Sequence, residues 1–485
     1  MVGVLTFLAI FLLVFFGVQY VTRTGVFRIP GVVYYGDGVS SDEKLVLENL
    51  FTEETTLDKD VRIDARNTLS RDELSSSEYV YNIYVPVTDF YSTDTNINVE
   101  NTEQLFDTEF ARVHNFELIP VSELDFSRKL LSINGHYYLD DYDKGAVYRI
   151  ISFDSEKFND EVKPLVEATM SKSFPEKDNV LTFAQTGVTA LSRHMNEKLE
   201  AVGGDARFFA EKIAPFLSSF DITHTSNESS FSDYASGANI CSDKRFIDTL
   251  KAIGLDVVEL TGNHNQDCGD EDARNTIDIY KQNNIKIVGG GKTANEAAEP
   301  LELAEKGTNI TMLAFNQSTG GATLDDTPGA NQYYEDVAAE QIKNAKQRGD
   351  IVIVDVQYYE CSAYASTYED PICDAANSSA GDQIGFFRHL IELGADAVVG
   401  TSAHQPQTFE LYNDGVIYYG LGNLFFDQVW WPGTTRSLIL VHYFYNGKLL
   451  QTKIVPTVYG NDMQTELMDA DTTKWYLNRL ISVKP

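Results

Sequence analysis

Short apolar runs alternate with amphipathic stretches from residue 180 to about residue 400. This alternation is typical of a layered α/β domain, in which buried strands are followed by helices that cover the sheet. The predicted strands cover residues 180–184, 222–225, 256–260, 285–288, 310–315 and 351–357. The predicted helices cover residues 206–220, 244–253, 271–282, 337–347 and 384–393.

The last third of the chain has the pattern of strands without long helices between them. These strands are expected at residues 408–412, 416–419, 437–445 and 449–455. Because the connections are short, an antiparallel arrangement is favoured here. A parallel-type sheet followed by an antiparallel sheet predicts a two-sheet sandwich flanked by helices, an α/β fold.

Residues 29–178 are acidic and polar, and their periodicity is weaker. Strands are predicted at residues 79–88 and 129–138, the second with an Asn134-Gly135 turn, and helices at residues 40–57 and 160–171. We expect a small α+β domain of unknown role, without a chemical motif. The predicted division of the chain is an anchor at 1–22, this domain at 29–178, the α/β domain at 179–460 and a C-terminal tail at 461–485.

The first 18 residues form an uninterrupted apolar run, which residues 19–21 extend to a length that can span a bilayer. No small-x-small cleavage site follows, which favours an uncleaved transmembrane signal anchor over a removed signal peptide. Arg23 and Arg28 follow the run, and the positive-inside rule alone would place the body of the protein in the cytoplasm.

The four cysteines indicate the opposite side of the membrane. Cys241, Cys268, Cys361 and Cys373 are an even set within the predicted α/β domain. The simplest pairing joins Cys241 to Cys268 and Cys361 to Cys373, which requires an oxidising compartment. The sequence permits three connectivities as well as four free thiols.

The chain carries 72 acidic and 38 basic side chains, a formal charge of -34. Such a charge opposes binding to nucleic acid or to an anionic membrane surface. An acidic polymer would be repelled in the same way unless metal ions or a local basic pocket intervened.

Polar clusters follow several predicted strands, at residues 186–189, 226–229, 262–264 and 400–407. If these strand ends meet at one edge of the sheet, the clusters form one site; the alternative is a set of unrelated loops. Glu228 is then the natural anionic ligand or general base, and His264 and His404 are the natural imidazoles. Asp267 either caps the next helix or orients His264.

Three stretches carry a resemblance to a known family. They are residues 256–264 with Asp267 and Gly269, residues 394–400 leading to His404, and residues 417–427. In this order they resemble the CapA-type capsule-synthesis proteins of poly-γ-glutamate biosynthesis, whose domain is similar to calcineurin-like metallophosphoesterases. The resemblance covers roughly residues 181–457. It implies a metallophosphoesterase-like sandwich and a role in making, exporting or anchoring a poly-γ-glutamate-like polymer.

The chain departs from the metal-binding pattern of this family. The family's Gly-Asp after the first strand is replaced by Gln-Thr-Gly at residues 185–187, a histidine is replaced by Gln357, and only His404 remains of a His-His-Pro-His motif. A complete two-metal centre is therefore not expected. A single divalent ion (Mn, Zn or Fe) or no metal fits the residues better.

The expected site residues divide by role. The expected metal ligands are Glu228, Asn263, His264 and His404. The expected catalytic residues are Glu228, His264, His404 and, as a second candidate general base, Glu360. The expected substrate-binding residues are Thr186, Asn227, Gln357, Gln405 and Asn423.

Two functions are compatible with these residues. One is metal-assisted hydrolysis or transfer at a phosphoester or γ-amide; the other is non-catalytic binding of an acidic polymer or glycan. Trp430 and Trp431 either line a groove for such a ligand or pack in the core. In both cases we expect a single-pass membrane protein with an extracytoplasmic body, working with other capsule-synthesis membrane proteins and not with nucleic acid.

Overall fold

A computed structural model describes residues 33–50, 61–75, 78–154, 174–317, 321–323, 325–358 and 382–485. The predicted membrane anchor at 1–22 and the predicted helix at 160–171 lie outside these ranges. Across the ranges that are described, the helices are all too short or too polar to cross a bilayer. The fold is a mixture of helices and several sheets, as the sequence predicts.

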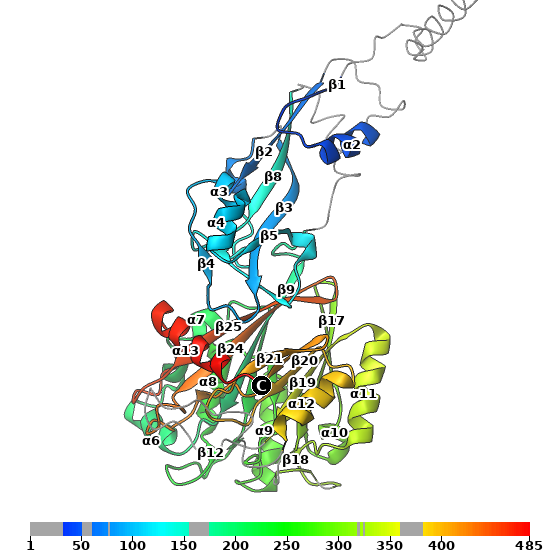
Figure 1. Cartoon of the computed structure of the whole chain (residues 1–485). Helices are drawn as coiled ribbons and strands as arrows, with labels where there is room; N and C mark the ends of the chain where they lie inside the picture. Colours follow the sequence, from blue (N-terminus) through cyan, green and yellow to red (C-terminus); the bar gives the residue numbers. More distant parts are fainter. Residues whose placement is uncertain are drawn as a thin grey trace, which may run out of the picture. The chain divides into compact units, whose positions relative to one another are not determined.

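The chain divides into two compact units (Figure 1). The first comprises Met1–Thr88, Thr95–Leu124 and Leu130–Glu176. The second comprises Lys177–Pro485 together with the short segments Asp89–Asp94 and Asp125–Lys129. The predicted division into four parts stays a prediction.

The elements before residue 155 alternate short strands with short helices. In chain order they are β1 (Val33–Tyr35), α2 (Ser41–Leu50), β2 (Val61–Thr68), η1 (Arg71–Glu73), β3 (Glu78–Asp89), β4 (Asn96–Ile97), α3 (Thr102–Phe106), α4 (Thr108–Val113), β5 (Glu117–Pro120), η2 (Val121–Glu123), β6 (Arg128–Leu130), β7 (Ser132–Ile133) and β8 (Val147–Asp154).

The main sheet of the first unit has the order β1-β2-β8-β3-β5. β1 runs parallel to β2, and the remaining pairs along this order are antiparallel. The predicted strand at 79–88 is confirmed as β3. The predicted turn is also confirmed, because Asn134 and Gly135 have φ angles of 51° and 84° and Ile133 bridges to His136.

The second unit contains both long buried strands and short strands of two to four residues. They are β9 (Val180–Thr189), β10 (Ile222–Asn227), β11 (Ser230–Phe231), β12 (Cys241–Ser242), β13 (Val257–Glu259), β14 (Lys286–Val288), β15 (Gly290–Gly291), β16 (Leu301–Glu305), β17 (Thr308–Asn316), β18 (Gly329–Ala330), β19 (Ile351–Gln357), β20 (Ala397–Gly400), β21 (Phe409–Tyr412), β22 (Gly415–Tyr418), β23 (Asn423–Phe425), β24 (Arg436–Tyr445), β25 (Lys448–Val458) and β26 (Glu466–Leu467).

Helices of the second unit follow many of these strands. They are α6 (His194–Ala201), η4 (Ala206–Ala210), α7 (Ala214–Leu217), η5 (Lys244–Phe246), α8 (Ile247–Ala252), α9 (Asp270–Gln282), α10 (Ala294–Ala297), α11 (Glu335–Arg348), α12 (Gln383–Glu392) and α13 (Ala470–Ser482).

Two large sheets form a sandwich in the second unit. One has the order β14-β13-β10-β9-β24-β25-β26, with β23 also paired to β9, and the other has the order β16-β17-β19-β20-β22-β21. One apolar cluster contains inward-facing residues of both sheets, such as Phe183, Ile222, Met312 and Ile353. The sheets therefore pack face to face, which confirms the predicted sandwich.

Alternate residues of the second sheet face a different core. Leu313, Val354 and Val398 belong to a cluster that includes Ile342 of α11 and Phe387 of α12. These two helices cover the outer face of that sheet (Figure 1). The period of two along each strand thus supplies two hydrophobic faces, one for the partner sheet and one for the helices.

Two expectations are wrong in detail. The predicted helix at 206–220 is split into η4 and α7, because Pro215 lies in the first turn of α7 and cannot continue a preceding helix. The final strands do not form a separate antiparallel sheet, since β22 lies parallel to β20 whereas β24 pairs antiparallel with β9. Strand β24 is buried throughout, so its pattern did not indicate which sheet it joins.

Residues after 460 contribute to the core of the second unit. Tyr476, Leu477 and Leu480 on one side of α13 belong to the apolar cluster between the sheets. Asp469 caps the helix by accepting a hydrogen bond from the Thr472 amide. This helix is therefore an integral part of the unit.

We expect Leu480→Ala to lower the free energy of unfolding by about 2–5 kcal/mol, because it leaves a cavity at a fully buried position. The matched control is Leu467→Ala, at a leucine that is 43% exposed in β26, which we expect to change stability by less than about 0.5 kcal/mol. Urea unfolding of the full chain measures both. Equal effects would mean that α13 does not contribute to the folded core.

Candidate functional site

The inner face of the sandwich changes from apolar to polar along its parallel strands. In β10 and the residue after it, Ile222 is followed at every second position by His224, Ser226 and Glu228. The same progression occurs along the other strands, with Phe183 followed by Gln185, Val257 by Glu259, and Ile353 by Asp355 and Gln357. Because successive residues of equal parity share a face, the carboxyl ends of these strands enclose a buried polar region.

The outermost layer of this region joins three predicted site residues. The amide nitrogen of Gln357 lies 3.2 Å from Glu228 Oε1 and 3.2 Å from Asn263 Oδ1, and donates to both. Glu228 is only 1% exposed. Glu228 follows β10, Asn263 follows β13 and Gln357 ends β19, so the two sheets of the sandwich meet at this contact.

His404 is the fourth member of this layer. Its Nδ1 lies 2.7 Å from Asn423 Oδ1, which can only accept, so Nδ1 carries the proton. The other ring nitrogen, Nε2, lies 4.0 Å from Glu228 Oε2. Asn423 is itself held by donating to Thr434 O at 3.0 Å. The imidazole is therefore fixed in one tautomer and one orientation.

Glycine at position 262 permits the close approach of two of these loops. A Cβ atom at Gly262 would lie 2.8 Å from both Cα and Cγ of Glu228. Any side chain there would displace Glu228 from its contact with Gln357. This is the physical reason for the glycine before Asn263 and His264.

The remaining predicted residues have other partners. His264 is bound through Nδ1 to Asp267 Oδ2 at 2.8 Å, which agrees with an orienting role for Asp267. Thr186 donates to the carbonyl of His224 at 2.8 Å, and Asn227 donates to the carbonyl of Ser229 at 2.7 Å. The threonine and asparagine side chains thus serve the local backbone.

Other predicted residues are buried or lie outside the structure. Gln405 is 1% exposed. Glu360, Cys361 and Cys373 lie outside the described residues. Cys241 and Cys268 form a disulfide with a Cα–Cα distance of 5.9 Å, which ties β12 to the loop that carries His264.

A second polar layer lies deeper between the sheets, and sequence reasoning missed it. Thr452 donates to His442, His442 donates through Nε2 to Gln185, and Gln185 donates to Asp355. His224 lies beside this chain, with Nε2 3.1 Å from Asp355 Oδ2 but out of line for a hydrogen bond. A spacing of two from a predicted site residue could have found Asp355, which precedes Gln357 on the same face of β19.

The deeper layer contains ionisable groups that are removed from water. Burial raises the pKa of Glu259, and the charge of Asp355 raises it further. Burial lowers the pKa of His442 to about 3, with His224 adding to the effect. His442 is therefore neutral at neutral pH, in agreement with its acceptor role toward Thr452.

The described side chains around Gln357 are joined by hydrogen bonds and are not gathered as a set of metal ligands. In the part of the chain that the structure describes, no group of three or more His, Cys, Asp or Glu side chains is arranged to hold a metal ion. The amide nitrogen of Gln357 lies between Glu228 Oε1 and Asn263 Oδ1 and donates a neutral N–H to each. Asp267 holds only Nδ1 of His264, the arrangement that would orient Nε2 if this histidine bound a metal.

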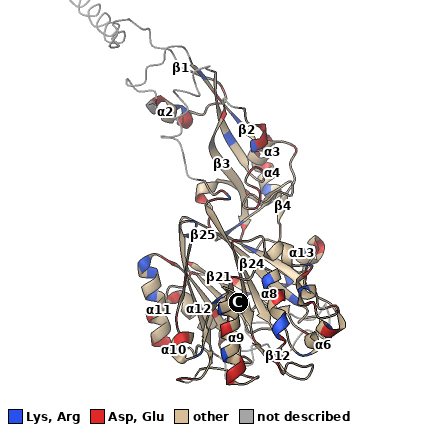
Figure 2. Ribbon diagram, turned by 180° about the vertical axis from the view of Figure 1, so that it is seen from behind, with Lys and Arg blue, Asp and Glu red and all other residues tan. Residues whose placement is uncertain are grey.

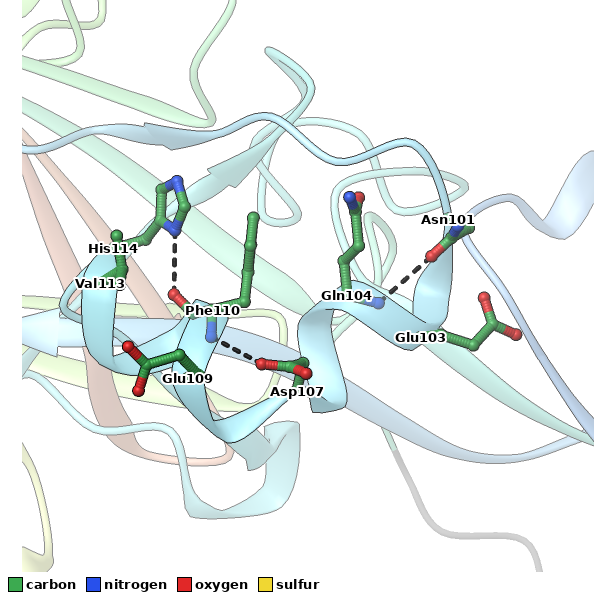
Figure 3. A pocket seen from close by; sticks show the side chains of 8 residues that line it. All are labelled: Asn101, Glu103, Gln104, Asp107, Glu109, Phe110, Val113 and His114. Atoms are coloured by element: carbon green, nitrogen blue, oxygen red, sulfur yellow. Dashed lines mark hydrogen bonds between the residues drawn. The ribbon is translucent and has the colours of Figure 1, made fainter.

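A separate hollow of about 560 Å³ lies on the first unit, beside α3 and α4 (Figure 3). Its wall contains Glu103, Asp107 and Glu109 as well as the apolar side chains of Phe110 and Val113. Asp107 and Asn101 are N-caps of these helices, so part of this polar lining already serves the backbone. The hollow lacks the convergent polar groups of the site in the second unit.

We expect stability to decline as the pH falls, in a way that depends on His442. Its folded pKa of about 3 lies below the usual value of 6.5, so protons bind preferentially to the unfolded chain. The stability that comes from keeping His442 neutral is fully present above pH 6.5. It is lost as the pH falls toward 3, by about 1.4 kcal/mol per pH unit. Urea unfolding between pH 7 and pH 4.5 measures this slope.

His442→Gln removes this proton uptake, so its stability should decline less steeply over the same range. His389→Gln is the control, because His389 is a partly exposed histidine on α12 whose pKa is raised by Glu335. The same acid slope in wild type and His442→Gln would contradict a buried, neutral His442.

The family model for "Bacterial capsule synthesis protein PGA_cap" matches residues 182–428, which include Glu228, Asn263, His264, Gln357 and His404. A curated relative, the capsule biosynthesis protein CapA of Bacillus anthracis, is 24% identical over 281 residues, covering 55% of this chain and 65% of that protein. The PGA biosynthesis protein CapA of Bacillus subtilis is 26% identical over 282 residues, covering 56% of this chain and 70% of that protein.

A probable polyglutamine synthesis accessory protein of Mycobacterium tuberculosis is 25% identical over 254 residues, covering 48% of this chain and 63% of that protein. Among solved structures, TT1561 of Thermus thermophilus aligns with 55% of this chain and 99% of its own, at 11% identity and a TM-score of 0.30, which is too low to support a fold assignment. The match to the family model covers half of the chain, and with it the entire outer layer of the site. The chain belongs to the bacterial capsule synthesis protein family.

Proposed function

We propose that this protein acts in the biosynthesis, export or anchoring of a poly-γ-glutamate-like surface polymer, and that the site between its sheets binds the polymer without a resident transition metal. Membership of the capsule synthesis family supports the polymer class. The names of the Bacillus relatives support the same biosynthetic role. A metallophosphoesterase-like architecture stays a prediction, supported by the two-sheet sandwich.

The observation that carries the metal-free function is the position of the Gln357 amide nitrogen between Glu228 Oε1 and Asn263 Oδ1. An amide donor in this place satisfies both oxygens without a cation. Glu228 and Asn263 are acceptors, and such groups suit the N–H of an amide ligand. A γ-amide of the polymer offers this N–H.

A second candidate function is metal-assisted hydrolysis or transfer. It is favoured by one specific contact, the orientation of His404 by Asn423, which directs Nε2 toward Glu228. In this version Glu228, Asn263, His264 and His404 would hold a divalent ion such as Mn, Zn or Fe. Glu360 as an additional general base stays a prediction outside the described residues.

We further propose that the protein is anchored in the cell membrane by residues 1–22 with its body outside the cytoplasm. The Cys241–Cys268 disulfide supports an oxidising compartment. Other capsule-synthesis membrane proteins are the proposed partners. The net charge of -34 argues against nucleic acid as a ligand.

The decisive test measures metal content and polymer binding in the purified full-length chain. We expect no stoichiometric transition metal after incubation with manganese or zinc, together with measurable binding of poly-γ-glutamate. Gln357→Ala should weaken polymer binding by about tenfold, because it removes the amide donor and leaves Glu228 and Asn263 without it. Calorimetric titration measures the affinity.

The control is Gln341→Ala, a glutamine on α11 that donates to the carbonyl of Ala298 outside the site. One equivalent of metal that disappears in His264→Ala would decide for the second candidate. In cells, polymer production that survives both His264→Ala and His404→Ala would show that neither imidazole takes part in the function.

A further inference from the structure

The proposed ligand carries a carboxylate on every residue, and the protein is strongly acidic. Acidic residues are distributed over helices of both units (Figure 2). A carboxylate-bearing chain therefore needs directed hydrogen-bond donors next to the site, because the overall field repels it. One arginine shortly after the end of β9 has the geometry for this task.

Arg193 is held in an unusual backbone conformation, with φ 51° and ψ -123°. This conformation strains the backbone of an L residue, so the surrounding contacts must maintain it. Its amide donates to the carbonyl of Asn239 at 3.2 Å. Its guanidinium donates through Nε to Asp427 Oδ1 at 3.1 Å, and Nη2 donates to the same oxygen.

These contacts leave one edge of the guanidinium available. Asp427 is fully buried and accepts on the edge formed by Nε and Nη2. No described residue accepts from Nη1, and the Arg193 side chain is 25% exposed. The ring of Phe426 lies below the guanidinium, with 4.4 Å from Cζ to the ring centroid. The position of the outer edge is thus fixed before any ligand binds.

An imidazole shares Asp427 with Arg193, and two tryptophan rings lie beside that imidazole. His194 is bound through Nδ1 to Asp427 Oδ2 at 2.8 Å, which directs its other ring nitrogen away from Asp427. The ring centroid of Trp430 lies 6.2 Å from that of His194, in an edge-to-face arrangement. It lies 5.6 Å from the ring centroid of Trp431. Trp430 is 49% exposed and Trp431 is 38% exposed, so these rings are not core residues. We call Arg193, His194, Trp430 and Trp431 the arginine–tryptophan patch.

The patch adjoins the candidate site through a single ring. Phe426 lies under Arg193, and its centroid is 5.2 Å from that of His404. The loops that carry Arg193 and Glu228 both follow parallel strands of one sheet, β9 and β10. Phe426 thus connects Arg193 of the patch to His404 of the site.

We propose that the arginine–tryptophan patch is a carboxylate-binding subsite, in which the Nη1 edge of Arg193 binds an α-carboxylate of a γ-linked polyglutamate and the tryptophan rings pack on its methylene groups. This inference rests on the proposed polymer-binding function and specifies which part of the polymer is recognised. Planar donation from arginine and apolar contact with tryptophan are complementary to a carboxylate on an aliphatic chain.

The test compares binding of two probes to the full-length chain by calorimetric titration. One is poly-γ-glutamate, and the other is the same polymer with its α-carboxylates converted to amides. Arg193→Lys keeps a cation for Asp427 but loses the planar edge, so we expect about tenfold weaker binding of the first probe and little change for the second. Trp430→Ala, at an exposed position that does not support the fold, should weaken binding of both probes.

Matched controls are Arg207→Lys, at an exposed arginine paired with Asp205, and Trp475→Ala, at a tryptophan 38% exposed on α13. Neither should change the affinity. Tight binding of poly-γ-glutamate that is unaffected by Arg193→Lys and Trp430→Ala would overturn the subsite and leave the proposed function intact. Absence of binding by the wild-type chain would overturn the proposed function and the subsite together.

Discussion

Buried polar groups between two sheets are the constraint on which the second unit depends. At the apolar end of the sandwich, residues such as Phe183 and Ile353 need only to pack. At the other end, Gln185, Asp355 and Gln357 are almost fully buried, and each needs a partner from the opposite sheet. An unpaired buried group costs about 1–3 kcal/mol, so these contacts fix how the two sheets lie against each other.

The same constraint shapes the site. Glu228 is held by a glutamine from the other sheet, and His404 is held by Asn423, which is itself bound to the backbone. Each side chain therefore has one orientation before any ligand arrives, which is the condition for selective recognition. The amide nitrogen of Gln357 joins Glu228 and Asn263, and so connects the two sheets at the site.

Electrostatics limits which ligands the site can bind without a cation beside it. The protein has a net charge of -34, and the site contains the carboxyl group of Glu228 beside the Gln357 amide. Arg193 supplies a cation next to it, and the strain in its backbone shows that several contacts combine to hold it there. The buried Asp427 neutralises its inner edge and leaves the outer edge for directional bonding.

The sequence by itself determined the main strands and several helices of the second unit, because their periods of two and 3.6 are local properties of the chain. The strand predicted at 351–357 coincides with β19, and the α/β class and the sandwich follow from such segments. It also located Glu228, Asn263, Gln357 and His404, since polar residues after buried strands meet at one sheet edge. Only the tertiary structure decided that β24 joins the first sheet, and that Gln185, His224 and Asp355 form a buried layer. The physical reason is that these contacts join residues far apart in the sequence: a period of two indicates that a side chain is buried, whereas its partner depends on which strands pack together.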